Sequence, residues 1–425
     1  PFCFLEIDSH TADAGIDTRI GAFLDIIEQR RRIAQAPSVS QPVPPSLGRV
    51  DYSARRPRLI TGSGESLGFD DPRVVHVLLA DTPAITSRLF ASLYGRMGWR
   101  CVVTPFTDAK ILQAARHVCS GRECLPFLSM VGKTVLYLRD RAPNEVTVFH
   151  LLEQEGPCQI GNWFDAAHLI FRRLGADNAV TVWPRIENNY LGGGERVAVA
   201  AAAAAVVGDL LCEVRSALTC LASDPAAALA QLDSVEDRLV AAAGRGLVAA
   251  DLELRRIARE LARIPLASRL EDTPKVLLFS GINRIFVDKP VRDFFEGQGI
   301  IAKTGDIGEF LCFYETESVV RRGFALGRHS PNEHFALATL LAGVVRNRTS
   351  QSRFQALRAG LHVKAIEVLD HHWRRILATT GLVFGPDIRF RELLQAGHEQ
   401  VSINGWTEAP CTVGRYLLSL DEGAY

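Results

Sequence analysis

The sequence lacks several patterns that would place it at once in a class of proteins. It has no net charge, because 48 Lys and Arg residues balance 48 Asp and Glu residues. A nucleic-acid-binding protein or a polybasic membrane anchor would show a basic excess, so we expect no nucleic-acid partner and no membrane attachment. The longest apolar run, residues 197–207, has 11 residues, whereas a transmembrane helix needs about 20.

The sequence also lacks common targeting and catalytic signatures. No charged segment followed by an apolar one opens the chain, so no signal peptide is predicted. The nine cysteines are odd in number and include no CxxC pair, which disfavours a disulfide framework and zinc and favours the cytoplasm. No GxSxG motif occurs, and no GxGxxG motif follows a strand. Because the chain begins with Pro1 rather than Met, we expect it to be a piece of a longer polypeptide.

Short apolar runs alternate with helical segments over much of the chain. We predict strands at 74–80, 100–104, 146–152, 179–183, 276–280 and 300–303, and helices at 20–32, 85–94, 108–117, 164–174, 291–298, 352–379 and 388–397. Strands that alternate with helices indicate parallel βαβ units. The predicted fold is therefore α/β, with two Rossmann-like parallel-sheet units that are separated and followed by helical regions.

Changes in composition suggest six regions. Residues 35–72 contain Pro37, Pro42, Pro44, Pro45 and Pro57, which we expect to exclude regular structure. Alanine dominates the start of the region after residue 194, which favours a helical region of two long helices. The predicted regions are the end of a preceding domain (1–34), a Pro/Gly-rich linker (35–72), a first Rossmann-like, cluster-binding unit (73–194), a helical region (195–272), a second Rossmann-like unit (273–350), and a helical region with a truncated C-terminal unit (351–425).

Two cysteine-containing stretches are the best candidates for chemistry. CSGRECLPF, residues 119–127, holds Cys119 and Cys124, and EGPCQIGNW, residues 155–163, holds Cys158. Both follow elements of the first α/β unit, where ligands bind beyond the carboxyl ends of strands. Glycines allow a close backbone approach, and backbone N–H groups at a helix start can donate to thiolate sulfur. This is a suitable setting for an iron–sulfur cluster, although cysteines that simply pack are the alternative.

The remaining cysteines favour packing. Cys101 lies in a predicted strand, Cys212 and Cys220 lie in the alanine-rich region, and Cys312 lies among aromatic residues, so we expect these to be core residues. Cys411, between Pro and Gly residues, is a weaker site candidate.

The two stretches together resemble the G-x-E-C-x-P and G-P-C-x-x-G signatures of the 2-hydroxyacyl-CoA dehydratase and benzoyl-CoA reductase family. The segments LEIDSHTADAGIDTRIGAFLDII, KVLLFSGINRIFVDKPVRDFFEGQGI and TEAPCTVGRY extend the resemblance to the C-terminal part of the fused CoA-substrate-specific enzyme activases, over nearly the whole chain. The second signature continues with Gly161-Asn162-Trp163, where the family usually has Gly-Gln-Tyr, so the resemblance leaves the substrate open.

The resemblance implies a cofactor, its ligands and its partners. The family holds a [4Fe-4S] cluster or a double-cubane cluster, into which an ATP-hydrolysing activase delivers a low-potential electron. By motif match, Cys124 and Cys158 are the implied metal ligands and Cys119 is an accessory candidate. A third ligand is expected beyond residue 425. The implied partners are the activase, a possible CoA thioester substrate, and a second subunit or fused half.

Three functional hypotheses follow. The favoured one is an enzyme component, an iron–sulfur reductase or dehydratase activated by an ATP-dependent partner, whose catalytic residues are unknown. The second is a non-catalytic, cluster-carrying electron-relay module. The third is a cluster-free α/β scaffold in which the cysteines only pack.

Overall fold

The computed structural model divides the chain into two units, residues 1–45 and 46–425. It describes Leu24, Ile27 and residues 46–53, 56–79, 83–120, 122–153, 158–278, 290–325, 350–403 and 408–422. Leu24 and Ile27 are helical, and the rest of the helix predicted at 20–32 lies outside the described residues. All further description concerns the second unit.

The second unit begins with a small antiparallel sheet. It consists of β1 (Arg49–Asp51), β2 (Arg58–Ile60) and β3 (Ser66–Leu67), in the order β1-β2-β3. The expectation that prolines exclude regular structure from 35–72 is therefore wrong for residues 49–67. Pro57 immediately precedes β2, where its missing N–H removes no ladder hydrogen bond. Leu59 at the centre of β2 is fully buried and anchors the sheet to the core.

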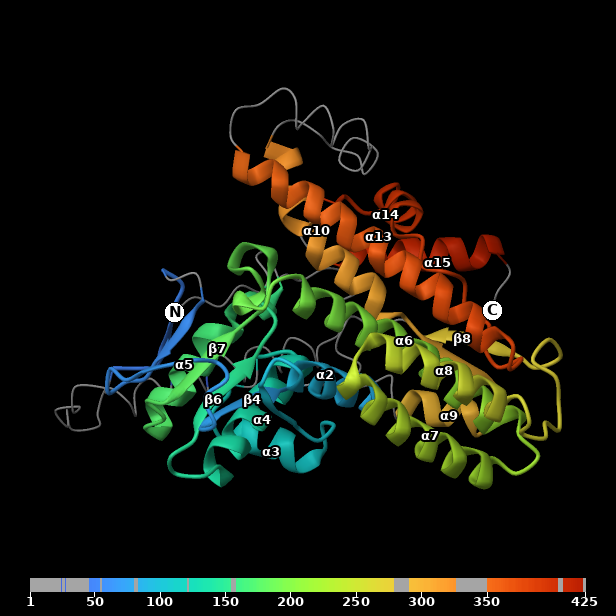
Figure 1. Ribbon diagram of the computed structural model, residues 1–425, viewed down its shortest axis with the longest axis horizontal. Coiled ribbons are helices and arrows are strands. Elements are labelled where there is room, and N and C mark those ends of the chain that lie inside the picture. The colour runs from blue at the N-terminus through green and yellow to red at the C-terminus, as the bar shows by residue number, and fades with distance from the viewer. Residues whose placement is uncertain are drawn as a thin grey trace. The chain divides into compact units, whose positions relative to one another are not determined.

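A four-stranded parallel sheet is the centre of the first α/β region (Figure 1). Its strands are β4 (Val74–Leu78), β5 (Arg100–Val103), β6 (Val146–His150) and β7 (Ala179–Val182), in the order β5-β4-β6-β7. This confirms the four strands predicted here. The chain leaves β4 for β5 on one side and later adds β6 on the other, so the topological switch point lies between β4 and β6.

Alternate side chains of these strands enter two different cores. Val75 and Val77 of β4 pack with residues of α4 (Leu125–Asp140) and α5 (Trp163–Leu174), and with Ala115 of α3 (Ala109–Arg116). Val74 and Leu78 belong to the other core, with residues of α2 (Ala84–Gly95) and the alanine-rich region. Helices therefore cover both faces of the sheet, as expected for a parallel sheet.

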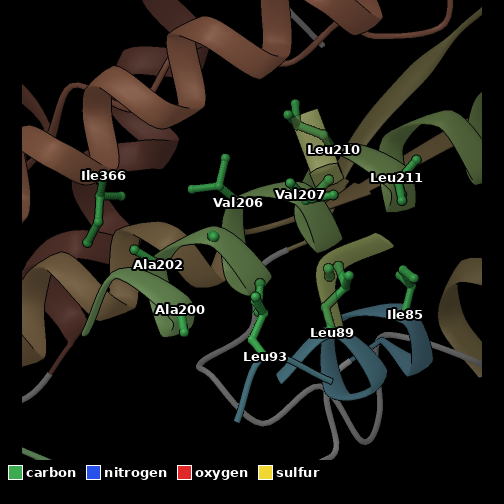
Figure 2. Close-up of a cluster of buried hydrophobic side chains, with 14 of the residues drawn as sticks. Ile85, Leu89, Leu93, Ala200, Ala202, Val206, Val207, Leu210, Leu211 and Ile366 are labelled. Atoms are coloured by element: carbon green, nitrogen blue, oxygen red, sulfur yellow. The ribbon is translucent and has the colours of Figure 1, made fainter. Parts of the chain in front are cut away.

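The alanine-rich region is helical, as predicted, but it forms three helices rather than two. They are α6 (Glu195–Leu221), α7 (Pro225–Arg245) and α8 (Leu247–Leu261). Gly246 separates α7 from α8 with a φ of 128°, which non-glycine residues rarely adopt. Helix α6 passes between α2 and the C-terminal helices. Figure 2 shows its Val207 on the side of Leu89 and Leu93 of α2, and its Val206 on the opposite side, toward Ile366.

Within the described residues, α6 is the single helix that is long and apolar enough to cross a membrane. Of its most apolar 18-residue window, 78% is buried inside the protein, and a buried core helix passes the same test.

The C-terminal half contains a second, smaller parallel pair of strands. Strands β8 (Lys275–Leu278) and β9 (Ile301–Thr304) pair in parallel, and α9 (Arg292–Glu296) lies between them in the sequence. The longer helices that follow are α10 (Ile307–Ala325), α13 (Ser350–Ala378), α14 (Phe390–His398) and α15 (Ala409–Glu422). The described part of the chain is thus mixed α/β and mostly helical, with one four-stranded parallel sheet and two small sheets.

Candidate functional site

Two of the three candidate cysteines lie at the starts of helices. Cys124 is the N-cap of α4, and Pro126 in the first turn suits a helix start because its missing N–H is not needed there. Cys158 is the N-cap of the short 3₁₀ helix η1 (Gln159–Asn162), which leads directly into α5. Since α4 precedes β6 and α5 follows it, both helix starts lie at the carboxyl edge of the sheet.

The side chain of Gln159 joins the two cysteine loops. Its Oε1 accepts a hydrogen bond from the backbone N–H of Cys124 at 2.8 Å, although the two residues are 35 positions apart. Its Nε2 donates to the carbonyl oxygen of Arg122 at 3.3 Å. A single amide therefore satisfies one backbone group on each side of Glu123 and holds the loop before α4 against the turn after β6.

The Cys158 thiol is partly buried and receives a hydrogen bond. Burial raises the pKa of Cys158, the backbone N–H of Ile160 donates to its sulfur and lowers the pKa, and nearby Glu408 and Cys124 raise it further. The N–H···S bond confirms the expectation that a helix start donates to sulfur here. The effect of Cys124 on this pKa also shows that the two thiols are electrostatic neighbours.

The third candidate, Cys119, has different surroundings. Burial and nearby Glu123 raise the pKa of Cys119 to about 11, while Arg173 works in the opposite direction. Glu123 turns back onto its own loop, where it accepts hydrogen bonds from the backbone N–H groups of Ser120 at 2.9 Å and Arg122 at 3.0 Å. Cys119 thus lies on the same loop as Cys124, but the Gln159 bridge does not include it.

The two cysteines Cys124 and Cys158 could supply two of the four thiolates that usually hold a [4Fe-4S] cluster. Cys124 is exposed and Cys158 is partly buried, so both sulfurs are available, and sulfur is the donor that an iron–sulfur cluster uses. Among the described residues, no group of three or more His, Cys, Asp or Glu side chains is arranged to hold a metal ion. Further ligands would therefore have to come from other residues. Cys312 and Cys411 are buried in the core, as predicted for Cys312.

The structure also assembles polar groups that the sequence analysis did not single out. His76 of β4 and His150 of β6 contact each other beside the cysteine-bearing edge, with Nδ1 of His76 3.0 Å from Nε2 of His150. The one available sequence signal was that His150 lies near the end of the strand predicted at 146–152, and parallel sheets bind ligands at that end of a strand. The partner residue could not be inferred, because the pair forms only when β4 and β6 become neighbours.

A second polar cluster joins helices that are far apart in the sequence. The Tyr190 hydroxyl lies 2.8 Å from Glu315 Oε2 and 2.9 Å from His362 Nδ1, and His362 Nε2 lies 2.5 Å from Glu195. Arg358 pairs with Glu195 at 2.6 Å. The cluster therefore links the residues before α6 with α6, α10 and α13.

Comparison of the chain with protein-family models, curated proteins and solved structures finds no match.

Proposed function

We propose that the chain is the iron–sulfur component of an ATP-activated, low-potential reductase or dehydratase system. The observation that carries the proposal is the Gln159 bridge, which brings two helix-capping cysteines to one edge of a parallel sheet. Packing alone gives no reason for an exposed Cys124 at this position. Cytoplasmic location, which keeps thiols reduced, is part of the proposal.

In this proposal each residue of the site has a defined task. Cys124 and Cys158 hold the cluster through their thiolates, with Cys119 as an accessory ligand. The Ile160 N–H stabilises negative charge on the Cys158 sulfur, and Gln159 sets the spacing of the two loops. When bound, the cluster supplies one-electron transfer at low potential.

The proposed partners follow from the resemblance of the cysteine stretches to the dehydratase and reductase family. An ATP-hydrolysing activase domain or subunit delivers the electron, a CoA thioester is the proposed substrate, and a second subunit or fused half completes the assembly. The strands β8 and β9 belong, in this proposal, to a second Rossmann-like unit. The electrostatic effect of Glu408, which raises the pKa of Cys158, supports the idea that the C-terminal segment approaches the site.

Iron and acid-labile sulfide measured after strictly anaerobic purification test the proposal. We expect stoichiometric iron and sulfide, lost on exposure to air, and a large loss of iron in Cys124→Ser and in Cys158→Ser. Cys220→Ser is the matched control, because Cys220 lies on α6, away from both loops, and packs against the core. Full iron retention in both site variants would refute the ligand assignment, and no iron after reconstitution would favour the cluster-free scaffold.

A second assay separates the enzyme from the electron relay. The iron-loaded chain is mixed with an activase and ATP, and reduction or dehydration of CoA thioesters is followed. Turnover that depends on all components supports the enzyme. Cluster reduction without turnover of any thioester would support the relay module instead.

A further inference from the structure

A cavity of about 170 Å³ lies at the carboxyl edge of the four-stranded sheet. Leu78 at the end of β4 and His150 at the end of β6 both line it, so it lies at the topological switch point. Open α/β sheets bind ligands at this point. Ala201 of α6 and Tyr314 of α10 also line it. An engineered cavity of about 150 Å³ in another protein binds benzene, so this volume suits a molecule with one six-membered ring.

The hydrogen-bonding state of His150 follows from its neighbours. Nε2 of His76 lies 2.8 Å from the carbonyl oxygen of Phe69, and a carbonyl can only accept, so this nitrogen carries the proton. Burial lowers the pKa of His76 to about 4, so the ring is neutral and its Nδ1 accepts the hydrogen bond from His150 Nε2. Burial also lowers the pKa of His150 well below its usual value. The Nδ1 atom of His150 is therefore unprotonated and can accept a hydrogen bond, and no donor to it is found among the described residues.

Trp163 contributes a complementary donor. It lines the same cavity, only 4% of its surface is exposed, and its buried Nε1 has no acceptor among the described residues. Leaving a buried N–H without an acceptor is costly, so such groups usually meet a partner. A ligand that presents an acceptor would satisfy it.

The other walls are aromatic and aliphatic. Of the charged residues that line the cavity, Glu315 and Arg185 have partners, and Glu187 is exposed to solvent. The aromatic residues are Phe90, Tyr94, Trp183, Tyr190 and Tyr314. Glu315 bonds with Tyr190 and His362, and Arg185 pairs with Glu153 at 2.6 Å. A charged ligand would lose hydration here without finding a buried counter-charge that lacks a partner among the described residues, so the cavity favours a neutral molecule.

The backbone beside the cavity is held in an unusual conformation. Asn189, Tyr190 and Leu191 have φ values of 49°, 50° and 58°, in the left-handed region that non-glycine residues rarely adopt. The hydrogen bonds of the Tyr190 hydroxyl to Glu315 and His362 hold this turn in place. Strained backbone of this kind clusters at ligand sites.

We propose that this cavity binds a small neutral ring compound with a primary carboxamide, whose carbonyl accepts from Trp163 Nε1 and whose N–H donates to His150 Nδ1. The inference goes beyond the proposed iron–sulfur function and does not depend on it. It rests on the cavity, on the Trp163 N–H that lacks an acceptor among the described residues, and on the hydrogen bond between His76 and His150.

Binding of three similar probes to the full chain, without added iron, tests the proposal by calorimetry and ligand-observed NMR. Benzamide offers an acceptor and a donor, acetophenone offers only the acceptor, and isopropylbenzene offers neither. We expect benzamide to bind roughly three- to tenfold more tightly than acetophenone, and isopropylbenzene to bind most weakly, since each step removes one hydrogen bond. Ala201→Leu, which fills the cavity, should abolish binding of all three.

Trp163→Phe should weaken benzamide and acetophenone roughly three- to tenfold and leave isopropylbenzene unchanged. Trp373→Phe is the matched control, because this buried indole already donates to Asp251 at 3.1 Å and does not line the cavity. Absence of saturable benzamide binding, or equal affinity for benzamide and acetophenone, would overturn the proposal on the wild-type chain alone. Benzamide binding by a chain that never takes up iron would uphold this inference and refute the proposed function.

Discussion

Glu213→Gln should destabilise the protein more than almost any other single change of charge. The Glu213 side chain, on α6, is 1% exposed and pairs with Lys303 of β9. Its two oxygens also lie 3.0 and 3.3 Å from Arg374 Nη1 on α13, and Oε2 accepts the backbone N–H of Gly385 at 3.0 Å. One carboxylate thus joins three segments that are distant in the sequence.

The expected size of the effect follows from burial and charge. Burial works to raise the pKa of Glu213, but Arg374 and Lys303 hold it well below its usual range, so the group is ionised at neutral pH. Glutamine keeps the volume but removes the negative charge that compensates these two buried cations. Removing one partner of a buried ion pair costs about 3–5 kcal/mol. Because Asp306 still pairs with Lys303 at 2.6 Å, we expect the lower end, about 3 kcal/mol.

Urea unfolding followed by far-ultraviolet circular dichroism measures this loss. Glu65→Gln is the matched control, since Glu65 pairs with Arg73 at 2.8 Å but both side chains are about half exposed, 48% and 46%. Exposed pairs contribute about 0–1 kcal/mol, so the control should unfold almost like the wild type. Both variants could instead lose the same small amount of stability, with an unchanged slope of unfolding free energy against urea concentration. In that case the buried network does not hold α6, β9 and α13 together.

The other predictions concern pH and helix packing. Burial lowers the pKa of His362, but hydrogen bonds to Glu315 and Glu195 outweigh it and raise the pKa above 6.5. This stabilisation is present below pH 6.5 and is lost as pH rises through the raised value, so wild type should lose more unfolding free energy than His362→Gln between about pH 6 and 9. Equal losses would contradict this reasoning. Gly132→Ala places a Cβ 2.0 Å from a backbone oxygen of α3 and should cost about 1–3 kcal/mol in thermal unfolding. The new Cβ of Gly95→Ala meets nothing within 4 Å, so this variant should be more stable than wild type by about 0.5–1 kcal/mol. If both glycine variants lose stability, the close contact with α3 is not the cause of the loss in Gly132→Ala.

Local patterns in the sequence determined much of the secondary structure. The apolar runs that became β4 to β7 were recognisable because buried parallel strands carry continuous apolar residues. Helix α4 had no such signal. Its Val131, Gly132, Thr134 and Val135 are poor helix formers, and the helix forms because these residues are buried against the sheet. The same dependence on packing explains the unexpected strands at 49–67.

The candidate site also has some features that local sequence predicts and others that depend on the folded structure. Cys124 and Cys158 were identifiable from the sequence, because glycine and proline beside a cysteine at a helix start are local features. Three other features could not be identified from the sequence: the Gln159 bridge, the His76–His150 pair, and the buried Trp163 N–H without an acceptor among the described residues. Each depends on contacts or burial that arise only when the sheet folds. The sequence by itself therefore determined which side chains could do chemistry. The tertiary structure decided which of them meet, because distances between residues far apart in the chain are set by packing and not by local propensity.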